Sequence, residues 1–189
     1  MQESVRTVKV QPFCRYFVHS MCVFCCVYGP QTLFDALESQ TPNLSSMIIG
    51  NVWATHNAEN IAASTKAEKK DFIIGGTKLL LETPIRTNVN VFQPFLNALL
   101  LIVAANQNDF AFENDEKDEI RGFDSTYSKL AHSSIFNLDV NAEIVNPRQY
   151  FISQVHPFLQ SPTASSVIPK PFTPTEQRTI AELRQEFNI

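Results

Sequence analysis

The stretch EKKDFIIGGTKLLLETP, residues 68–84, decides the fold because it combines helical spacing with two adjacent glycines. Its apolar residues recur at i, i+1, i+7 and i+8, which is typical of an amphipathic helix. They are Phe72, Ile73, Leu79 and Leu80. A glycine inside a helix costs roughly 0.5–1 kcal/mol relative to alanine. We therefore predict a buried helix on which Gly75 and Gly76 let a neighbouring helix approach closely, with Leu79 and Leu80 beside them in the packing.

The same glycines could belong to a phosphate-binding loop, since the segment 75–78 reads GGTK. That loop requires G-x-x-x-x-G-K-[ST] after a strand. Here Lys78 follows a threonine, and no glycine stands at the earlier position. We therefore expect no nucleotide and no other cofactor at this segment.

The rest of the chain predicts further helices, separated by turns that proline or glycine marks. We expect them at residues 12–28, 31–39, 44–57, 91–107 and 148–156, with a short helix or turn at 122–132. Asn43 is expected to cap the third helix, Asn146 to open the helix that Pro157 limits, and residues 161–174 to form a loop. Thr173 and Glu176 form a capping box that predicts a final helix.

This pattern of paired helices, with few strand signals, predicts an all-α fold. HEAT and armadillo repeats occupy about 40–47 residues each, so 189 residues hold about four helix pairs. Such pairs stack into a superhelix, an α-solenoid, in which neighbours cover each pair on both sides. An ordinary all-α domain is the alternative.

The charge is concentrated in one segment. Residues 109–119 carry six acidic residues and one lysine, whereas the whole chain has a net charge of −4. The bases form no stripe, so we expect no nucleic-acid partner. A solvated turn is the simpler interpretation of this acidic segment. The functional interpretation makes it a partner contact through Asp115, Glu116, Asp118 and Glu119.

All four cysteines lie within thirteen residues, on one predicted helix, which favours core thiols in a reducing compartment over a disulfide framework. They are Cys14, Cys22, Cys25 and Cys26. His19, Cys22 and Cys26 share a helical face, but structural zinc sites draw ligands from separate elements, so we expect no metal. The apolar run 13–28 is shorter than the roughly 20 residues of a membrane-spanning helix, and we expect no membrane insertion. No set of residues has catalytic spacing, so we expect no enzyme.

Three motifs resemble the exportin-2 family of karyopherin-β proteins, also called cellular apoptosis susceptibility proteins. They are EKKDFIIGGTKLLLETP at 68–84, GFDSTYSKLA at 122–131 and NPRQYFISQVH at 146–156, in the family's order. In the first motif, nine residues match in register: Glu68, Lys69, Lys70, Gly75, Thr77, Lys78, Leu79, Leu80 and Pro84. The resemblance assigns residues 12–189 to the carboxy-terminal HEAT-repeat region of an exportin-2-like protein and leaves residues 1–11 unplaced.

The resemblance implies a transport receptor that carries importin-α out of the nucleus together with Ran-GTP and contacts the phenylalanine-glycine repeats of nucleoporins. It implies shuttling between nucleus and cytoplasm, and a basic segment of importin-α as a counterpart for the acidic segment. It also implies that an earlier repeat covers the helix holding Phe13, Phe17, Phe24 and Cys25, so the isolated chain is expected to self-associate or need a partner. The alternative function is a helical-repeat scaffold without a transport role.

Overall fold

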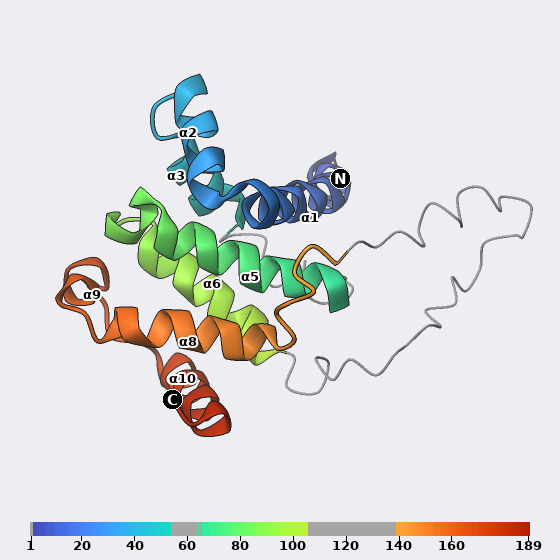
Figure 1. Ribbon diagram of the computed structural model, residues 1–189. Helices are drawn as coiled ribbons and strands as arrows, with labels where there is room; N and C mark the ends of the chain where they lie inside the picture. The colour runs from blue at the N-terminus through green and yellow to red at the C-terminus, as the bar shows by residue number, and fades with distance from the viewer. Residues whose placement is uncertain (1, 54–63, 65, 106–138) are drawn as a thin grey trace, which may run out of the picture.

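The computed structural model describes residues 2–53, 64, 66–105 and 139–189, with side chains from Phe13 onward (Figure 1). Every regular element in these ranges is helical, which confirms the all-α class; the number of repeats and the superhelix stay predictions. The α-helices are α1 (Gln2–Tyr28), α2 (Pro30–Gln40), α3 (Leu44–Ile48), α5 (Lys66–Glu82), α6 (Phe92–Ala104), α8 (Pro147–Leu159), α9 (Pro162–Val167) and α10 (Pro174–Phe187). A π-helix, η1 (Ile49–Trp53), and a 3-10 helix, η2 (Pro84–Thr87), complete the set.

The helices stack as layers around α5. Helices α1, α2 and α3 lie on one side of the α5–α6 pair, and α8 and α10 lie on the other (Figure 1). Helix α5 contacts α1, α2, α6 and α8, and residues 72–77 are all buried. This central position explains why the segment 68–84 has apolar residues on more than one face.

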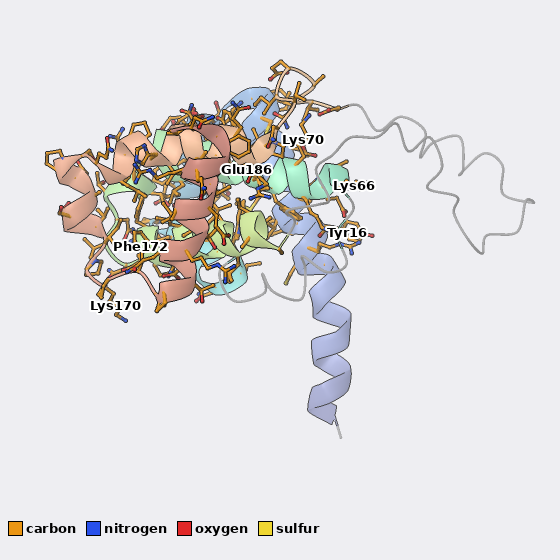
Figure 2. The ribbon with its side chains drawn as sticks, turned by 90° about the horizontal axis from the view of Figure 1, so that it is seen from below. Tyr16, Lys66, Lys70, Lys170, Phe172 and Glu186 are labelled. Atoms are coloured by element: carbon orange, nitrogen blue, oxygen red, sulfur yellow. The ribbon has the colours of Figure 1, made fainter. Side chains whose placement is uncertain are left out.

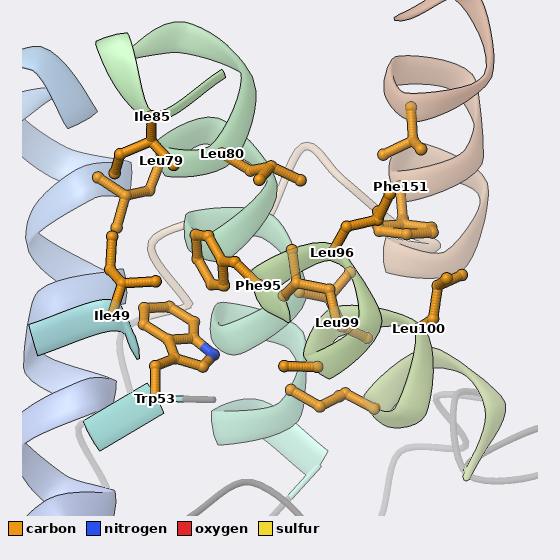
Figure 3. Packing of buried hydrophobic residues seen from close by; sticks show 14 of the residues in the cluster. Ile49, Trp53, Leu79, Leu80, Ile85, Phe95, Leu96, Leu99, Leu100 and Phe151 are labelled. Carbon is orange, nitrogen blue, oxygen red and sulfur yellow. The ribbon is translucent and has the colours of Figure 1, made fainter. Parts of the chain in front are cut away.

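The hydrophobic core is continuous through these layers (Figure 3). Trp53 meets Phe95 edge-on with ring centroids 4.6 Å apart, and Leu79 and Leu80 are 1% and 0% exposed. Phe151 of α8 reaches the same core from the opposite layer. Fully burying such a side chain contributes about 1.5–3 kcal/mol, so this core dominates the stability of the stack.

Two predicted caps are confirmed. The side chain of Asn146 accepts hydrogen bonds from the backbone N–H groups of Arg148 and Gln149 at the start of α8, at 3.0 and 3.1 Å. Thr173 and Glu176 form the reciprocal capping box at the start of α10.

Asn43 occupies the N-cap position of α3, as predicted, but its side chain does not cap the helix. Asn43 adopts a left-handed backbone with φ 65°, and its side chain makes no capping hydrogen bond to α3. The carboxylate of Glu38 satisfies that helix start instead, accepting from the Asn43 N–H at 2.6 Å and from the Ser45 N–H and hydroxyl. These bonds, that of the Ser45 hydroxyl above all, hold the pKa of Glu38 below its ordinary value.

Two proline positions also differ from the sequence prediction. Helix α8 continues through Pro157 and ends at Leu159, because the ring is exposed and lies in the last turn of the helix. The expected loop at 161–174 contains α9, with Pro162 at its first position, where a missing N–H costs no helical hydrogen bond. Ala164 and Val167 face the core at helical spacing. The expected linker after residue 57 and the helix or turn at 122–132 lie largely outside the described residues.

Candidate protein-interaction surface

Gly75 and Gly76 allow neighbouring elements to pack closely against α5. A Cβ atom at Gly75 would lie 2.5 Å from the carbonyl oxygen and 2.6 Å from the Cα of Cys22 on α1. A Cβ at Gly76 would lie 2.6 Å from a methyl carbon of Leu99 and 3.0 Å from the ring of Trp53. Backbone of α1 therefore rests directly on backbone of α5 at Gly75, whereas Gly76 meets side chains.

A charged residue near the start of α5, Lys70, contacts Asp139, the first described residue after the gap at 106–138. The Lys70 side chain is 4% exposed, and its ammonium donates to the Asp139 carboxylate at 2.7 Å. On the neighbouring face, Arg15 of α1 lies 4.0 Å from Glu68. A buried ammonium is stable only with such partners, so Lys70 holds Asp139 in place.

A second contact lies beside this ion pair. Asp71 accepts a hydrogen bond from the side-chain amide of Asn141 at 2.8 Å and lies 3.0 Å from the His19 ring on α1. Asn141 is 1% exposed, and its backbone N–H donates to Asp139 at 3.0 Å. These contacts tie residues 139–141 to both α1 and α5; we call Lys70, Asp71, Asp139 and Asn141, with His19, the polar anchor.

The polar anchor lies at the side of the molecule where α5 begins, α6 ends and α8 begins (Figure 1). Figure 2 shows Lys66 and Lys70 of α5 on this side. The predicted contact residues Asp115, Glu116, Asp118 and Glu119 lie outside the described residues, between the last residue of that block, Ala105, and Asp139. The anchor thus holds Asp139, where the described chain resumes twenty residues after Glu119.

Sequence reasoning assigned no role to Asp71 or Asn141. Asn141 is buried by its partners rather than by an apolar pattern, and its contacts with α5 span 70 residues. Lysines are ordinarily exposed, yet Lys69 and Lys70 are 8% and 3% exposed. In the sequence, the one sign that these lysines matter was that the triplet EKK at 68–70 matches the family motif.

Three of the thiols, Cys22, Cys25 and Cys26, are poor nucleophiles. Cys22 and Cys25 are 0% and 1% exposed, and burial raises the pKa of Cys25 to about 12 and that of Cys22 well above its ordinary value. Half-buried Cys26 also has a raised pKa, chiefly through burial, although a hydrogen bond from Asn141 and nearby Lys78 oppose the rise. On the helical face considered for zinc, His19 contacts Asp71, Cys22 is buried in the core, and Cys26 accepts a hydrogen bond from Asn141. Within the described ranges, no group of three or more His, Cys, Asp or Glu residues could hold a metal ion.

A mostly apolar groove of about 320 Å³ lies between α8 and α10. Its walls include His156, Leu159, Phe172, Ile180 and Arg184. Sequence reasoning missed it because the groove exists only once two helices separated by α9 pack side by side.

In a comparison with known protein families, residues 1–182 of the chain match the family "CAS/CSE protein, C-terminus". The chain belongs to the CAS/CSE family. Exportin-2 of Xenopus laevis is 23% identical over 158 residues, which are 80% of this chain and 16% of that protein. The chain therefore spans about a sixth of this relative's length. No solved structure matches the chain significantly.

The CAS/CSE match confirms the resemblance drawn from the three motifs. It includes residues 1–11, which the motifs left unplaced; of these, residues 2–11 form the first part of α1. No helix among the described residues is long and apolar enough to cross a membrane.

Proposed function

We propose that this chain serves as the carboxy-terminal region of a nuclear transport receptor that exports importin-α from the nucleus with Ran-GTP. The observation that carries the proposal is the family match over residues 1–182, and the likeness to Exportin-2 supports it. The receptor would shuttle between nucleus and cytoplasm and contact phenylalanine-glycine repeats of nucleoporins. Its role is non-enzymatic, which fits the protonated, buried thiols of α1.

The architecture suits a receptor whose two ligands bind cooperatively. Layers of helices contact mainly their neighbours, so a small shift between adjacent layers changes the curvature of the whole stack. Two ligands that prefer the same curvature then strengthen each other's binding. In this chain α5 would transmit such a shift, because it touches α1 on one side and α8 on the other.

We further propose that the acidic residues Asp115, Glu116, Asp118 and Glu119 contact a basic segment of importin-α. They belong to a segment with five net negative charges in eleven residues. The polar anchor is compatible with the proposal because it ties Asp139, twenty residues after Glu119, to the body of the protein. Single exposed ion pairs contribute about 0–1 kcal/mol, so the four residues must act together.

The proposal is tested by immobilising the chain and measuring the capture of importin-α with and without Ran-GTP. A quadruple variant with amides in place of the four carboxylates is compared with the parent from low to high salt. We expect the variant to associate more slowly, with a deficit that shrinks as salt rises, because charges are screened over about 8 Å at physiological ionic strength.

A charge-matched control replaces four other carboxylates by amides: Asp35, Glu82, Glu143 and Glu182. None of these belongs to the polar anchor or to the caps described above, and this control keeps the net charge of the quadruple variant. Equal slowing of both variants would mean that only net charge matters. Absence of importin-α capture by this chain at any salt would contradict the proposed contact of the acidic residues with importin-α and favour a helical-repeat scaffold role for this region.

A further inference from the structure

A groove of about 470 Å³ lies between α6 and the segment that leads into α10. Residues 89–97 contribute one wall, and residues 169–176 contribute the other. Both walls belong to internal segments of the chain. Figure 2 shows Lys170 on the opposite side of the molecule from Lys66 and Lys70. The groove is therefore separate from the polar anchor, and its volume is typical of a ligand-binding pocket.

Helix α6 carries only two polar residues, Gln93 and Asn97, and both line this groove. They stand four positions apart, so they lie one above the other on the same face of the helix. All other residues of α6 are apolar. A buried polar group costs stability unless it is hydrogen-bonded. Both amides therefore require polar partners in the groove.

Gln93 has such a partner, the main chain of Lys170. The side-chain Nε2 of Gln93 donates to the Lys170 carbonyl oxygen at 2.7 Å, and the Lys170 N–H donates to Gln93 Oε1 at 3.2 Å. Lys170 stands between Pro169 and Pro171, and a residue before proline favours an extended conformation. One side-chain amide thus holds both main-chain polar groups of one residue in an extended segment.

Asn97 presents the same amide chemistry one turn further along α6. Its side chain is half-buried, and its Oδ1 is buried with no hydrogen-bond partner among the described residues. The oxygen and NH₂ ends of an amide have nearly the same shape, so half a turn of the group can present either end to the groove. Asn97 lies about 6 Å beyond Gln93 along the helix axis. Adjacent extended chains need about 4.7–4.9 Å, so a second chain fits beside Lys170.

We propose that Asn97 binds the main chain of an extended peptide segment of a partner protein, in the way that Gln93 binds Lys170. Asn97 Nδ2 donates to a carbonyl oxygen of the segment, and Oδ1 accepts from the N–H of the same residue. The exposed Val89 and Pro94 supply apolar surface for its side chains. The walls carry one lysine and one glutamate and so have no net charge, which favours a main-chain ligand over a nucleic acid.

The test uses a probe peptide with a single main-chain donor. Acetyl-Pro-Pro-Ala-Pro-Pro dimethylamide is uncharged, is held extended by its prolines, and has one N–H, that of its alanine. The matched control peptide carries N-methylalanine at this position and has no N–H. Each peptide is titrated into the isotope-labelled whole chain to about 5 mM and followed by nuclear magnetic resonance, since we expect a dissociation constant on the order of 10⁻³ M for so short a ligand.

We compare the parent chain with Asn97→Leu and with the matched control Gln154→Leu. Leucine has a similar size but no amide, and Gln154 lies exposed on α8, outside the groove. In the parent and in Gln154→Leu the alanine peptide should bind about tenfold more tightly than the N-methyl peptide, because methylation leaves Asn97 Oδ1 unpaired. In Asn97→Leu the two peptides should bind equally. The side-chain amide resonances of Asn97 in the parent should shift with the alanine peptide.

The comparison of the two peptides on the parent decides the question even if Asn97→Leu does not fold. Equal binding of both peptides to the parent overturns the proposal, and so does the absence of any shift at the Asn97 amide. A preference for the alanine peptide that persists in Asn97→Leu also overturns it. Because the probes contain no part of importin-α or Ran, these measurements succeed or fail independently of the proposed transport function.

Discussion

Replacing Gly75 with alanine adds one methyl group at the place where α1 and α5 touch. The new carbon would lie 2.5 Å from the carbonyl oxygen, 2.6 Å from the Cα and 2.8 Å from the carbonyl carbon of Cys22. All three are backbone atoms, so no side-chain rotation relieves the contact. Non-bonded carbon atoms pack at about 3.5–4.0 Å, and the helices would have to separate by roughly 1 Å.

The expected loss combines two opposing effects. Overpacking a well-packed core costs about 1–3 kcal/mol. Alanine regains up to about 1 kcal/mol of helix propensity over glycine. We expect Gly75→Ala to lower the free energy of unfolding by about 1–2 kcal/mol, which for a chain of this size lowers the melting temperature by about 2–8 °C. Gly75→Leu should lose more. Gly76→Ala should lose less, because the nearest atom is the end of the flexible Leu99 side chain.

The assay is thermal and urea unfolding followed by circular dichroism, with Gly50→Ala as the matched control. A Cβ at Gly50 would meet nothing within 4 Å, so this variant should keep or raise the stability of the parent. If Gly75→Ala melts at or above the parent temperature, as Gly50→Ala should, the close contact between α1 and α5 does not exist and the reasoning is wrong.

Three further predictions concern pH, capping and the polar anchor. Burial raises the pKa of Cys25 to about 12, so above about pH 8.5 the unfolded chain releases a proton that the folded chain retains. Stability should therefore fall with rising pH, by about 1.4 kcal/mol per pH unit for this thiol, and urea unfolding from pH 8 to 10.5 should show a shallower fall in Cys25→Ala. Asn146→Ala should cost about 0.5–2 kcal/mol because it removes the cap of α8; an unchanged urea midpoint would contradict this. A double-mutant cycle of Lys70→Met and Asp139→Ala should give a coupling of about 0.5–1 kcal/mol, since Asp139 is 43% exposed, whereas additive losses would mean that the ion pair contributes nothing.

The sequence predicted the starts of helices best where residues close together in the sequence determine them. The capping box at Thr173 and the cap at Asn146 depend on residues within three positions, and both form as predicted. Asn43 takes the predicted N-cap position, but Glu38, one helix earlier, supplies the charged acceptor for the Ser45 N–H in place of the Asn43 side chain. Proline misled the prediction twice, since its effect depends on where it stands. At Pro162 it begins a helix, and at Pro157 it lies in a last turn that has little helix left to disrupt.

The polar anchor could not be predicted for a different reason. A lysine in an acidic and basic cluster is ordinarily solvated, and only the fold reveals that Lys70 lies inside, against a carboxylate 69 positions later. The same holds for Asp71, whose two oxygens serve His19 of α1 and Asn141. Periodicity describes which face of one helix is apolar, but it carries no information about which distant polar groups meet. Because a buried ammonium without partners would be costly, the anchor and the packing of α5 must form together. Any partner that moves Asp139 is therefore expected to act on α5, the helix that joins the layers.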